Sequence, residues 1–356
     1  MRVERPILRV IPCLNLPATA GWSSTFKVWL PCLSNATFVD TMYRRRLLPL
    51  CSRKMAKRSL ALVVMSLLGA GVAISATSPW PFKSNAAPPQ LSVSGSLTVA
   101  FWNIQWFPGM GPDANKDAER RQTASVHSEI SRINADVIGM EEVRDWDAAA
   151  LAVQPLKGMK VDVCATFPPR EGQNEAQEVA IASRLQPISA WVEMWKPAGL
   201  ATPPRGFAFA AYEIKPKQLL LVYCVHFKSN RGELSENVPI REEAAKQLLS
   251  HIEAMHRAYE PLGQVACIVG GDFNTSLDDP RFAAENTLRA LTKNGFQWIW
   301  QGTAPGTRMT LHGDRVFPPA CFDHIFYRGL TLRKGEVPNT ARSSSDHKPV
   351  VATFGL

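Results

Sequence analysis

The sequence has no CxxC pair of cysteines and no apolar run long enough to span a membrane, and each absence excludes a kind of structure. The seven cysteines form no CxxC pair and have no Cys/His spacing of the kind that holds zinc. The most apolar run, residues 60–74, is shorter than the roughly 20 residues that span a bilayer. Neither a cysteine-built metal site nor a long transmembrane helix is therefore predicted.

An excess of one charge is also missing from most of the chain. The formal net charge is +9, but residues 1–80 contain 11 Lys and Arg against 2 Asp and Glu, which accounts for all of it. Residues 81–356 contain 29 residues of each sign. Because contacts to nucleic-acid phosphates require Lys and Arg, this neutral part is not typical of a protein that binds DNA avidly without sequence preference.

The N-terminal segment has the composition of an export signal. A basic segment, residues 53–58, precedes the apolar run 60–74, and the small residues 75–78 follow it. We predict a signal peptide or membrane anchor over residues 55–78, with cleavage favoured because the run is short. The protein is then exported to the periplasm, the medium or the cell surface, and a cleaved signal leaves no stable membrane partner.

The remaining boundaries follow from composition. An export signal should lie at the N-terminus, so residues 1–54 are interpreted as a doubtful leader, an over-extended reading frame before Met55. Residues 79–96 are rich in Pro, Ser and Ala and are predicted to be a linker. Residues 97–356 alternate short apolar strands with amphipathic helices and show no composition break, so we expect one domain.

Asp272 and Asn274 follow a short apolar run, residues 264–269, which has the length and β-branched content of a buried strand. Two glycines then allow a sharp turn. Residues two apart in an extended chain point the same way, so a carboxylate and a carboxamide would lie side by side at a strand end. The alternative is an ordinary Asx turn.

Two further strand ends carry polar residues. Asn103 ends the predicted strand 97–104, and Glu142 follows the strand 136–140 directly. One residue of the pair Glu141-Glu142 must point inward, where a carboxylate is costly unless it meets a cation. Glu142 is therefore a candidate metal ligand, with a solvated loop glutamate as the alternative.

The middle of the chain adds a histidine and two cations. His226 ends the strand 218–225 on the same side as Cys224, which is a packed side, although a satisfied polar cap would also explain it. Arg205, before a predicted strand, and Lys228, after His226, offer positive charge to a substrate phosphate. For a lone arginine the alternative is ordinary surface charge.

Helical spacing predicts three helices, over residues 117–133, from Pro239 to about 258, and over about 279–294. In the second helix the apolar residues mark one buried stripe, and His251 falls outside it, so His251 is interpreted as a surface residue.

The end of the chain supplies a carboxylate and an Asp-His pair. Asp323 stands among apolar residues in a predicted strand, residues 321–327, and Asp346-His347 precede the last strand. A buried carboxylate beside a histidine is the usual arrangement for a general base held in one tautomer. Together with the earlier candidates, these hard oxygen ligands suit Mg²⁺ or Mn²⁺, with Ca²⁺ as a further alternative, better than zinc.

The order of the motifs WN, EEV, HFKS, GDFN, FDHIF and SDHKPV resembles the endonuclease/exonuclease/phosphatase superfamily, from about residue 97 to the C-terminus. The resemblance implies an α/β fold, a four-layer sandwich of two packed mixed sheets with helices outside. It also implies that Glu142 is the principal metal ligand, with Asn103 and Asp346 close to the ion or its waters. Phe101 and Glu141 depart from the residues that many members have there, a small polar residue and a glutamine.

The same resemblance implies roles for the other candidates. Asp272 would position or activate the attacking water, and Asn274 would steady the phosphate. Asp323 and His347 would form the carboxylate and histidine pair that shares a proton. His226 would donate to a phosphate oxygen as negative charge develops on it.

The resemblance implies phosphoester hydrolysis more firmly than it implies a substrate. We expect a monomeric, metal-dependent nuclease or phosphodiesterase, with nucleic acid as the expected substrate and a local basic groove near Arg205, Lys228 and Arg231. One alternative is a phosphatase or phospholipase that acts on an inositol phosphate or a sphingolipid headgroup. Another is a catalytically inactive binding module, which the complete set of candidate residues disfavours.

Overall fold

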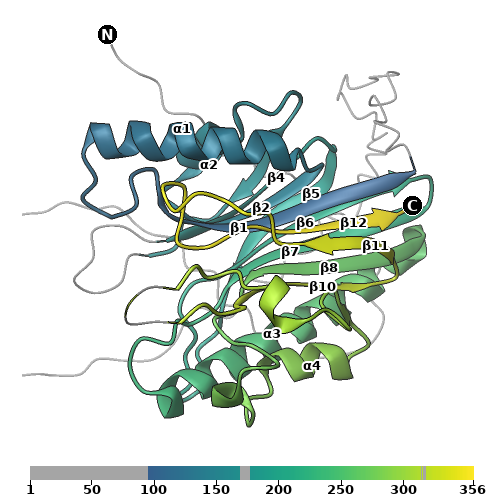
Figure 1. The fold of residues 1–356 in the computed structure, drawn as a ribbon. Coiled ribbons are helices and arrows are strands. Elements are labelled where there is room, and N and C mark those ends of the chain that lie inside the picture. The colour runs from purple at the N-terminus through teal and green to yellow at the C-terminus, as the bar shows by residue number, and fades with distance from the viewer. Residues whose placement is uncertain (1–94, 169–176, 314, 316–317) are drawn as a thin grey trace, which may run out of the picture. The chain divides into compact units, whose positions relative to one another are not determined.

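The computed structural model describes residues 95–168, 177–313, 315 and 318–356 of the protein. Their strands form two six-stranded sheets with both parallel and antiparallel neighbours, in the orders β11-β12-β1-β2-β4-β3 and β5-β6-β7-β8-β10-β9. Figure 1 shows α1 and α2 over the first sheet, and α3 and α4 on the outer side of the second. The predicted four-layer sandwich is confirmed. The predicted leader and signal segment, with the linker as far as residue 94, lie outside the described residues.

The elements have the following bounds. The first sheet contains β1 (Ser96–Phe107), β2 (Val137–Val143), β3 (Lys160–Cys164), β4 (Glu178–Ser183), β11 (Thr331–Glu336) and β12 (Val350–Gly355). The second contains β5 (Pro187–Met194), β6 (Gly206–Lys215), β7 (Gln218–His226), β8 (Gln264–Asp272), β9 (Gln297–Trp298) and β10 (Asp323–Arg328). The helices are α1 (Lys116–Ile133), α2 (Trp146–Val153), α3 (Leu234–Tyr259) and α4 (Thr287–Lys293).

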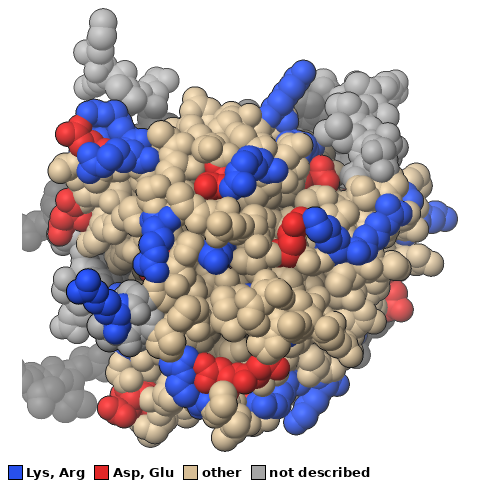
Figure 2. Space-filling view, in the orientation of Figure 1, with Lys and Arg blue, Asp and Glu red and all other residues tan. Residues whose placement is uncertain are grey.

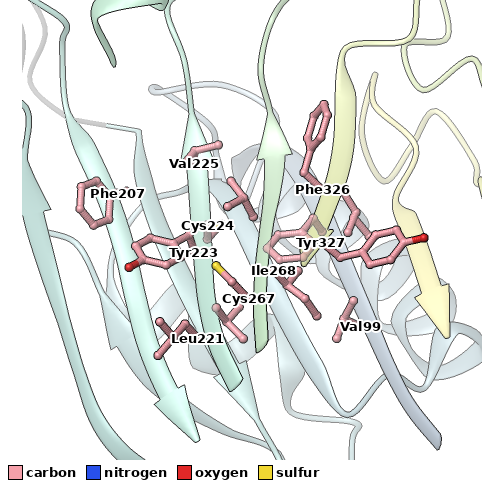
Figure 3. Packing of buried hydrophobic residues seen from close by; sticks show 14 of the residues in the cluster. Val99, Phe207, Leu221, Tyr223, Cys224, Val225, Cys267, Ile268, Phe326 and Tyr327 are labelled. Atoms are coloured by element: carbon pink, nitrogen blue, oxygen red, sulfur yellow. The ribbon is translucent and has the colours of Figure 1, made fainter. Parts of the chain in front are cut away.

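Alternation along β1 separates the two faces of the first sheet. Val99 belongs to the large hydrophobic core that also contains Ile268 of the second sheet, and Figure 3 shows both side chains in this core. Ala100 and Trp102, one position out of phase, pack instead in the cluster under α1 and α2. Because side chains alternate along a strand, β1 contributes residues both to the core between the sheets and to the core under the helices.

Phe101 explains Gly270, the first of the two glycines before Asp272. A Cβ added at Gly270 or at Gly139 would lie 2.3 Å from the Phe101 ring, so this ring packs on bare backbone in both sheets. The sequence interpretation of both glycines as a turn was wrong, because β8 continues through Asp272. Of the pair Gly270 and Gly271, only Gly271 has a positive φ, 131°.

Three helix expectations need correction. α3 begins at Leu234, a turn and a half before Pro239, which therefore lies inside the helix. The helix predicted over residues 279–294 is broken into a short 3₁₀ turn (η2, Pro280–Phe282) and α4. His251 is half-buried, because its ring packs against aromatic side chains of β5, β6 and β7 and its Nδ1 lies 3.1 Å from the Tyr223 hydroxyl.

The four described cysteines, Cys164, Cys224, Cys267 and Cys321, are free thiols. No helix among the described residues is both long and apolar enough to cross a membrane.

Candidate active site

His226, Asp272 and Asp323 form one row across the second sheet. Their strands β7, β8 and β10 are neighbours, and the strand register pairs Asp272 with His226 on one side and with Asp323 on the other. All three side chains are almost fully buried. Strand pairing alone therefore brings together three of the predicted catalytic residues.

Asn103 and Glu142 reach the same place from the first sheet. Glu142 has a φ of 59° and lies where the register of β2 shifts against both neighbouring strands, which is a β-bulge. The bulge leaves Glu141 on the inner face and turns Glu142 toward the site. Asn103 Nδ2 donates to Glu142 Oε1 and to Asp272 Oδ2, each at 3.1 Å, so one carboxamide connects the two sheets.

A strained irregularity near the end of β1, where its register against β2 shifts, holds these groups in place. Gln105 and Trp106 have φ values of 45° and 49°, a conformation that costs energy for residues other than glycine. In this segment the Trp106 N–H donates to Glu142 Oε2 and the Gln105 N–H donates to Asn103 Oδ1. Gln105 Oε1 accepts from the Asp346 N–H at 3.0 Å, which brings the segment before β12 to the same edge.

Asp323 and His347 form the expected carboxylate-histidine pair. His347 Nδ1 lies 2.8 Å from Asp323 Oδ2, and His347 Nε2 lies 3.9 Å from Asp272 Oδ2. Burial alone would lower the pKa of His347, but the charges of Asp323 and Asp272 outweigh it and raise this pKa well above its ordinary value. The imidazolium form is therefore stabilised, with its Nε2 toward Asp272.

His226 and Asn274 complete the surroundings of Asp272. His226 Nε2 lies 3.7 Å from Asp272 Oδ2 and 3.8 Å from Glu142 Oε1. The Asn274 N–H donates to Asp272 Oδ1 at 2.8 Å, and Asn274 Nδ2 donates to Asp272 Oδ2 at 3.0 Å. Asn274 has a φ of 53°, a conformation that asparagine adopts more readily than most residues.

Burial raises the pKa values of two acids in the site, Asp272 and Glu142. Burial raises the pKa of Asp272 to about 7; His347 opposes this shift and the like charge of Asp323 adds to it. Burial also raises the pKa of Glu142, against the Asn103 hydrogen bond. A carboxylate with a raised pKa is one whose charged form gains from a nearby cation, so both acids are electrostatically suited to a bound cation.

The donor set fits a hard divalent cation. Glu142 and Asp346 carry carboxylate oxygens, and Asn103 carries an amide oxygen that accepts from the Gln105 N–H. Oxygens of these kinds are the ligands that Mg²⁺ and Mn²⁺ prefer. Among the described residues, Oδ1 of Asp323 is buried without a hydrogen-bond partner. Three buried residues, Asp272, Asp323 and His347, each also have one possible ligand atom within 4.8 Å of those of the other two. In that triad His347 Nδ1 already bonds Asp323.

The two predicted substrate cations are held by main-chain carbonyls. The Arg205 guanidinium donates to the carbonyl oxygens of His226 and Phe227, and so supports the end of β7. It also lies close enough to Glu142 to lower the pKa of that acid. Lys228 Nζ donates to the carbonyls of Ser229 and Arg231. Both residues lie beside the site, and these contacts shape the loop after β7.

Two supporting residues were missed by the sequence analysis. The Ser345 hydroxyl donates to the Asn103 carbonyl at 2.7 Å and accepts from the His347 N–H at 3.0 Å, which fixes the turn that carries His347. Asn230 Nδ2 donates to the Asn274 carbonyl at 2.7 Å. Ser345 begins the SDHKPV motif and Asn230 directly follows the HFKS motif, but a serine or asparagine in a loop has no signal of its own.

A buried ion pair supports the same loop and was also missed. Arg241 of α3 is fully buried and bonds Glu285 through two nitrogens, at 2.8 and 2.7 Å. Its Nη1 donates to the Lys228 carbonyl and to Asn230 Oδ1. The sequence did indicate a buried arginine, because Arg241 stands three residues before Ala244 and thus on the apolar stripe of its helix.

Comparison with known proteins identifies relatives. A family model described as the Endonuclease/Exonuclease/phosphatase family matches residues 100–347. A UPF0294 protein of Vibrio parahaemolyticus is 24% identical over 268 residues, which is 75% of this chain and 80% of that protein. A UPF0294 protein of Vibrio cholerae is 29% identical over 153 residues, 43% of this chain and 46% of its own length.

Solved structures share the fold at low sequence identity. An endonuclease/exonuclease/phosphatase from Beutenbergia cavernae has a TM-score of 0.56 and 19% identity, and covers 74% of this chain and 72% of its own. The human Nocturnin catalytic domain has a TM-score of 0.56 and 18% identity, with 74% and 96% covered. Truncated Caenorhabditis elegans TDP2 has a TM-score of 0.51 and 19% identity, with 73% and 98% covered.

The family model covers more than two thirds of the chain and spans every candidate site residue from Asn103 to His347. Such membership supports a phosphoester hydrolase of the nuclease or phosphatase type. The chain belongs to the Endonuclease/Exonuclease/phosphatase family.

Proposed function

We propose that the protein is a metal-dependent phosphodiesterase, and specifically a nuclease, which uses activated water to attack phosphorus. The observation that carries the proposal is the buried line of Asp323, His347 and Asp272 beside the Glu142 carboxylate, with Asn103 connecting the two sheets. An acid of raised pKa next to a stabilised imidazolium gives the two proton-transfer groups that phosphoester hydrolysis needs.

Glu142, Asn103 and Asp346 would hold a divalent ion, Mg²⁺ or Mn²⁺. Such an ion, when bound, supplies charge stabilisation for the negative oxygens of a phosphoryl group. The rest of the chemistry falls to side chains. Their hydrogen bonds within the site fix each group before the substrate arrives, as preorganised electrostatic stabilisation requires.

In this proposal Asp272 orients the attacking water and accepts its proton. Two donors from Asn274 and one from Asn103 hold the Asp272 carboxylate in a single orientation. His347, held through Nδ1 by Asp323, directs Nε2 at the reacting group, where it stabilises or protonates the departing oxygen. His226 faces the same space and would donate to a phosphate oxygen.

Two observations support an oxyanion as the bound group. The site joins the imidazoles of His226 and His347 around Asp272 on one edge of the sandwich. A protein of the same fold, the human Nocturnin catalytic domain, has a bound sulfate anion. A phosphatase or a phospholipase for inositol phosphate or sphingolipid headgroups would use the same centre, so the substrate assay must include monoesters and lipids.

The test is hydrolysis of plasmid DNA, RNA and bis-p-nitrophenyl phosphate with Mg²⁺, with and without EDTA. We expect activity that EDTA abolishes and that His347→Ala lowers by about 10²- to 10⁴-fold, the usual contribution of a general acid-base group. His256→Ala, on α3 and outside the site, is the matched control. Absence of metal-dependent activity on every phosphoester would overturn the proposal, and cleavage of monoesters alone would reassign the protein as a phosphatase.

A further inference from the structure

A basic group of side chains lies beside Asp346 and His347, on a backbone segment that is held by hydrogen bonds. Leu311 pairs with His347 in an isolated β-bridge. On either side of it, the His312 N–H donates to the Asp346 carbonyl at 3.0 Å and the Lys348 N–H donates to the Thr310 carbonyl at 2.6 Å. This short ladder fixes His312 and Lys348 next to Asp346 and His347.

Arg342, in the loop before β12, is the third member of this basic group, with His312 and Lys348. Its Nη2 donates to the His312 carbonyl at 3.3 Å and to the Gly313 carbonyl, so the guanidinium is tethered at the same segment. The Arg342 side chain is exposed. Among the described residues, its other guanidinium nitrogens have no hydrogen-bond partner, which leaves donors available to a ligand. We name His312, Arg342 and Lys348 the rim cluster.

The rim cluster is electropositive. Burial lowers the pKa of His312, and the charges of Lys348 and Arg342 lower it further, so the positive charge of the cluster belongs to Lys348 and Arg342. The His312 main chain is hydrogen-bonded to Asp346, the residue before His347. Within the described part of the chain, no carboxylate forms an ion pair with Arg342 or Lys348, and His312 Nε2 is buried without a hydrogen-bond partner.

These features suit a phosphate oxygen. A guanidinium fork and an ammonium group are the side chains that most often bind phosphate, and charge-assisted hydrogen bonds are the stronger ones. On the face that Figure 2 shows, Lys and Arg side chains are dispersed among other residues rather than joined into a continuous stripe.

We propose that the rim cluster binds a second phosphate of the substrate, next to the phosphate being hydrolysed, and that the substrate is a nucleic-acid strand. This inference rests on the proposed function, because it places the second phosphate relative to Asp272 and His347. A strand carries a phosphate at every nucleotide, so one contact in the site and one at the rim cluster require only two adjacent nucleotides. A diester with a single phosphate cannot use the rim cluster.

The experiment compares a single-stranded 12-mer DNA with bis-p-nitrophenyl phosphate as substrates of the full chain. The variant is Arg342→Ala/Lys348→Ala, and the control of equal net charge is Arg257→Ala/Lys293→Ala, which removes exposed cations from α3 and α4. We expect the rim variant to raise KM for the 12-mer about tenfold or more and to leave kcat/KM for bis-p-nitrophenyl phosphate within about twofold. The dependence of log KM on log salt should flatten by about 2, one for each cation.

A second measurement separates this inference from the proposed function. Binding of a fluorescein-labelled 12-mer is measured by anisotropy with His347→Ala protein, with and without the two rim substitutions. Weaker binding in the rim variant supports the inference even if the wild-type protein proves inactive. Unchanged 12-mer binding and KM would overturn it, and so would an equal loss of activity on both substrates.

Discussion

At the scale of single residues, burial sets the pKa values of the acids in and near the site. Asp272 has its pKa raised because water is removed from it, yet three amide donors keep its carboxylate oriented. Glu141 is more extreme, because burial raises its pKa well above the ordinary value while the Cys224 thiol donates to it at 2.9 Å. Glu141 lies on the inner face of the sandwich and Glu142 at the site, so two adjacent glutamates have different environments.

Asp162 provides a prediction about stability away from the site. Its carboxylate accepts from the Ser183 and Tyr212 hydroxyls at 2.5 and 2.6 Å, and burial raises its pKa to about 6. The folded-state pKa exceeds the unfolded value of 3.8, so the folded protein binds this proton more tightly. The resulting stability is full below pH 4 and is lost as pH rises to about 6.

Asp162→Asn should therefore stabilise the protein at pH 8, by at most about 3 kcal/mol at 1.36 kcal/mol for each pKa unit, and should change little near pH 4. The amide oxygen can still accept from both hydroxyls. Urea denaturation at the two pH values measures the difference, with the exposed Asp113→Asn as control. A variant that is less stable at pH 8 by the same amount as at pH 4 would show that hydrogen-bond geometry, and not charge, dominates.

At the scale of elements, the site depends on a buried ion pair between α3 and the segment before α4. Arg241 connects Glu285 to Asn230, and Asn230 connects to the main chain of Asn274. Asn230→Ala removes the last connection and keeps the ion pair. We expect kcat/KM to fall about tenfold with a small change in the free energy of unfolding, because an intramolecular hydrogen bond contributes about 1 kcal/mol.

Arg241→Met is the contrasting variant for this prediction. It leaves the Glu285 carboxylate buried without its partner, which costs about 3–5 kcal/mol of unfolding free energy. Thermal denaturation and steady-state kinetics on the two variants distinguish positioning from folding. If Asn230→Ala leaves both kcat and KM unchanged, the connection to Asn274 has no role in catalysis.

The sequence predicted the central strands, because period-two patterns and apolar runs are local signals. It therefore placed His226 at the end of the strand that is β7 and Asp323 in the strand that is β10. It ended the strand before Asp272 at residue 269, although β8 continues to Asp272. The bulge that turns Glu142 toward the site could not be read locally, since it depends on register against β1 and β4. Half-polar strands such as β5 and β11 were also missed, because their alternation is weak.

Contacts between distant elements account for the remaining differences. Gly270 was interpreted as a turn residue, but its role is set by Phe101 from the other sheet. His251 was placed on the surface by helical spacing, but β5 and β6 present aromatic rings to it. Which residues meet across layers is information that a single strand or helix does not contain.

At the scale of the whole molecule, positive charge and function are separated along the chain. The excess of Lys and Arg lies in residues 1–80, and the family match begins at residue 100. The basic segment followed by the apolar run has the composition of an export signal. We therefore propose that the basic N-terminal segment directs export and that substrate contacts come from local cations of the neutral domain.

This proposal predicts cleavage of the exported protein after the apolar run 60–74, within or just after residues 75–78. Small residues there suit a signal peptidase, and the run is too short to favour anchoring. N-terminal sequencing of the exported protein should begin near residue 79. Leu62→Arg, which places a charge in the apolar run, should block export, whereas Ser84→Arg beyond the expected cleavage site should not. Recovery of residues 60–74 in the exported protein would show an anchor, and peptides from residues 1–50 in the precursor would contradict a start at Met55.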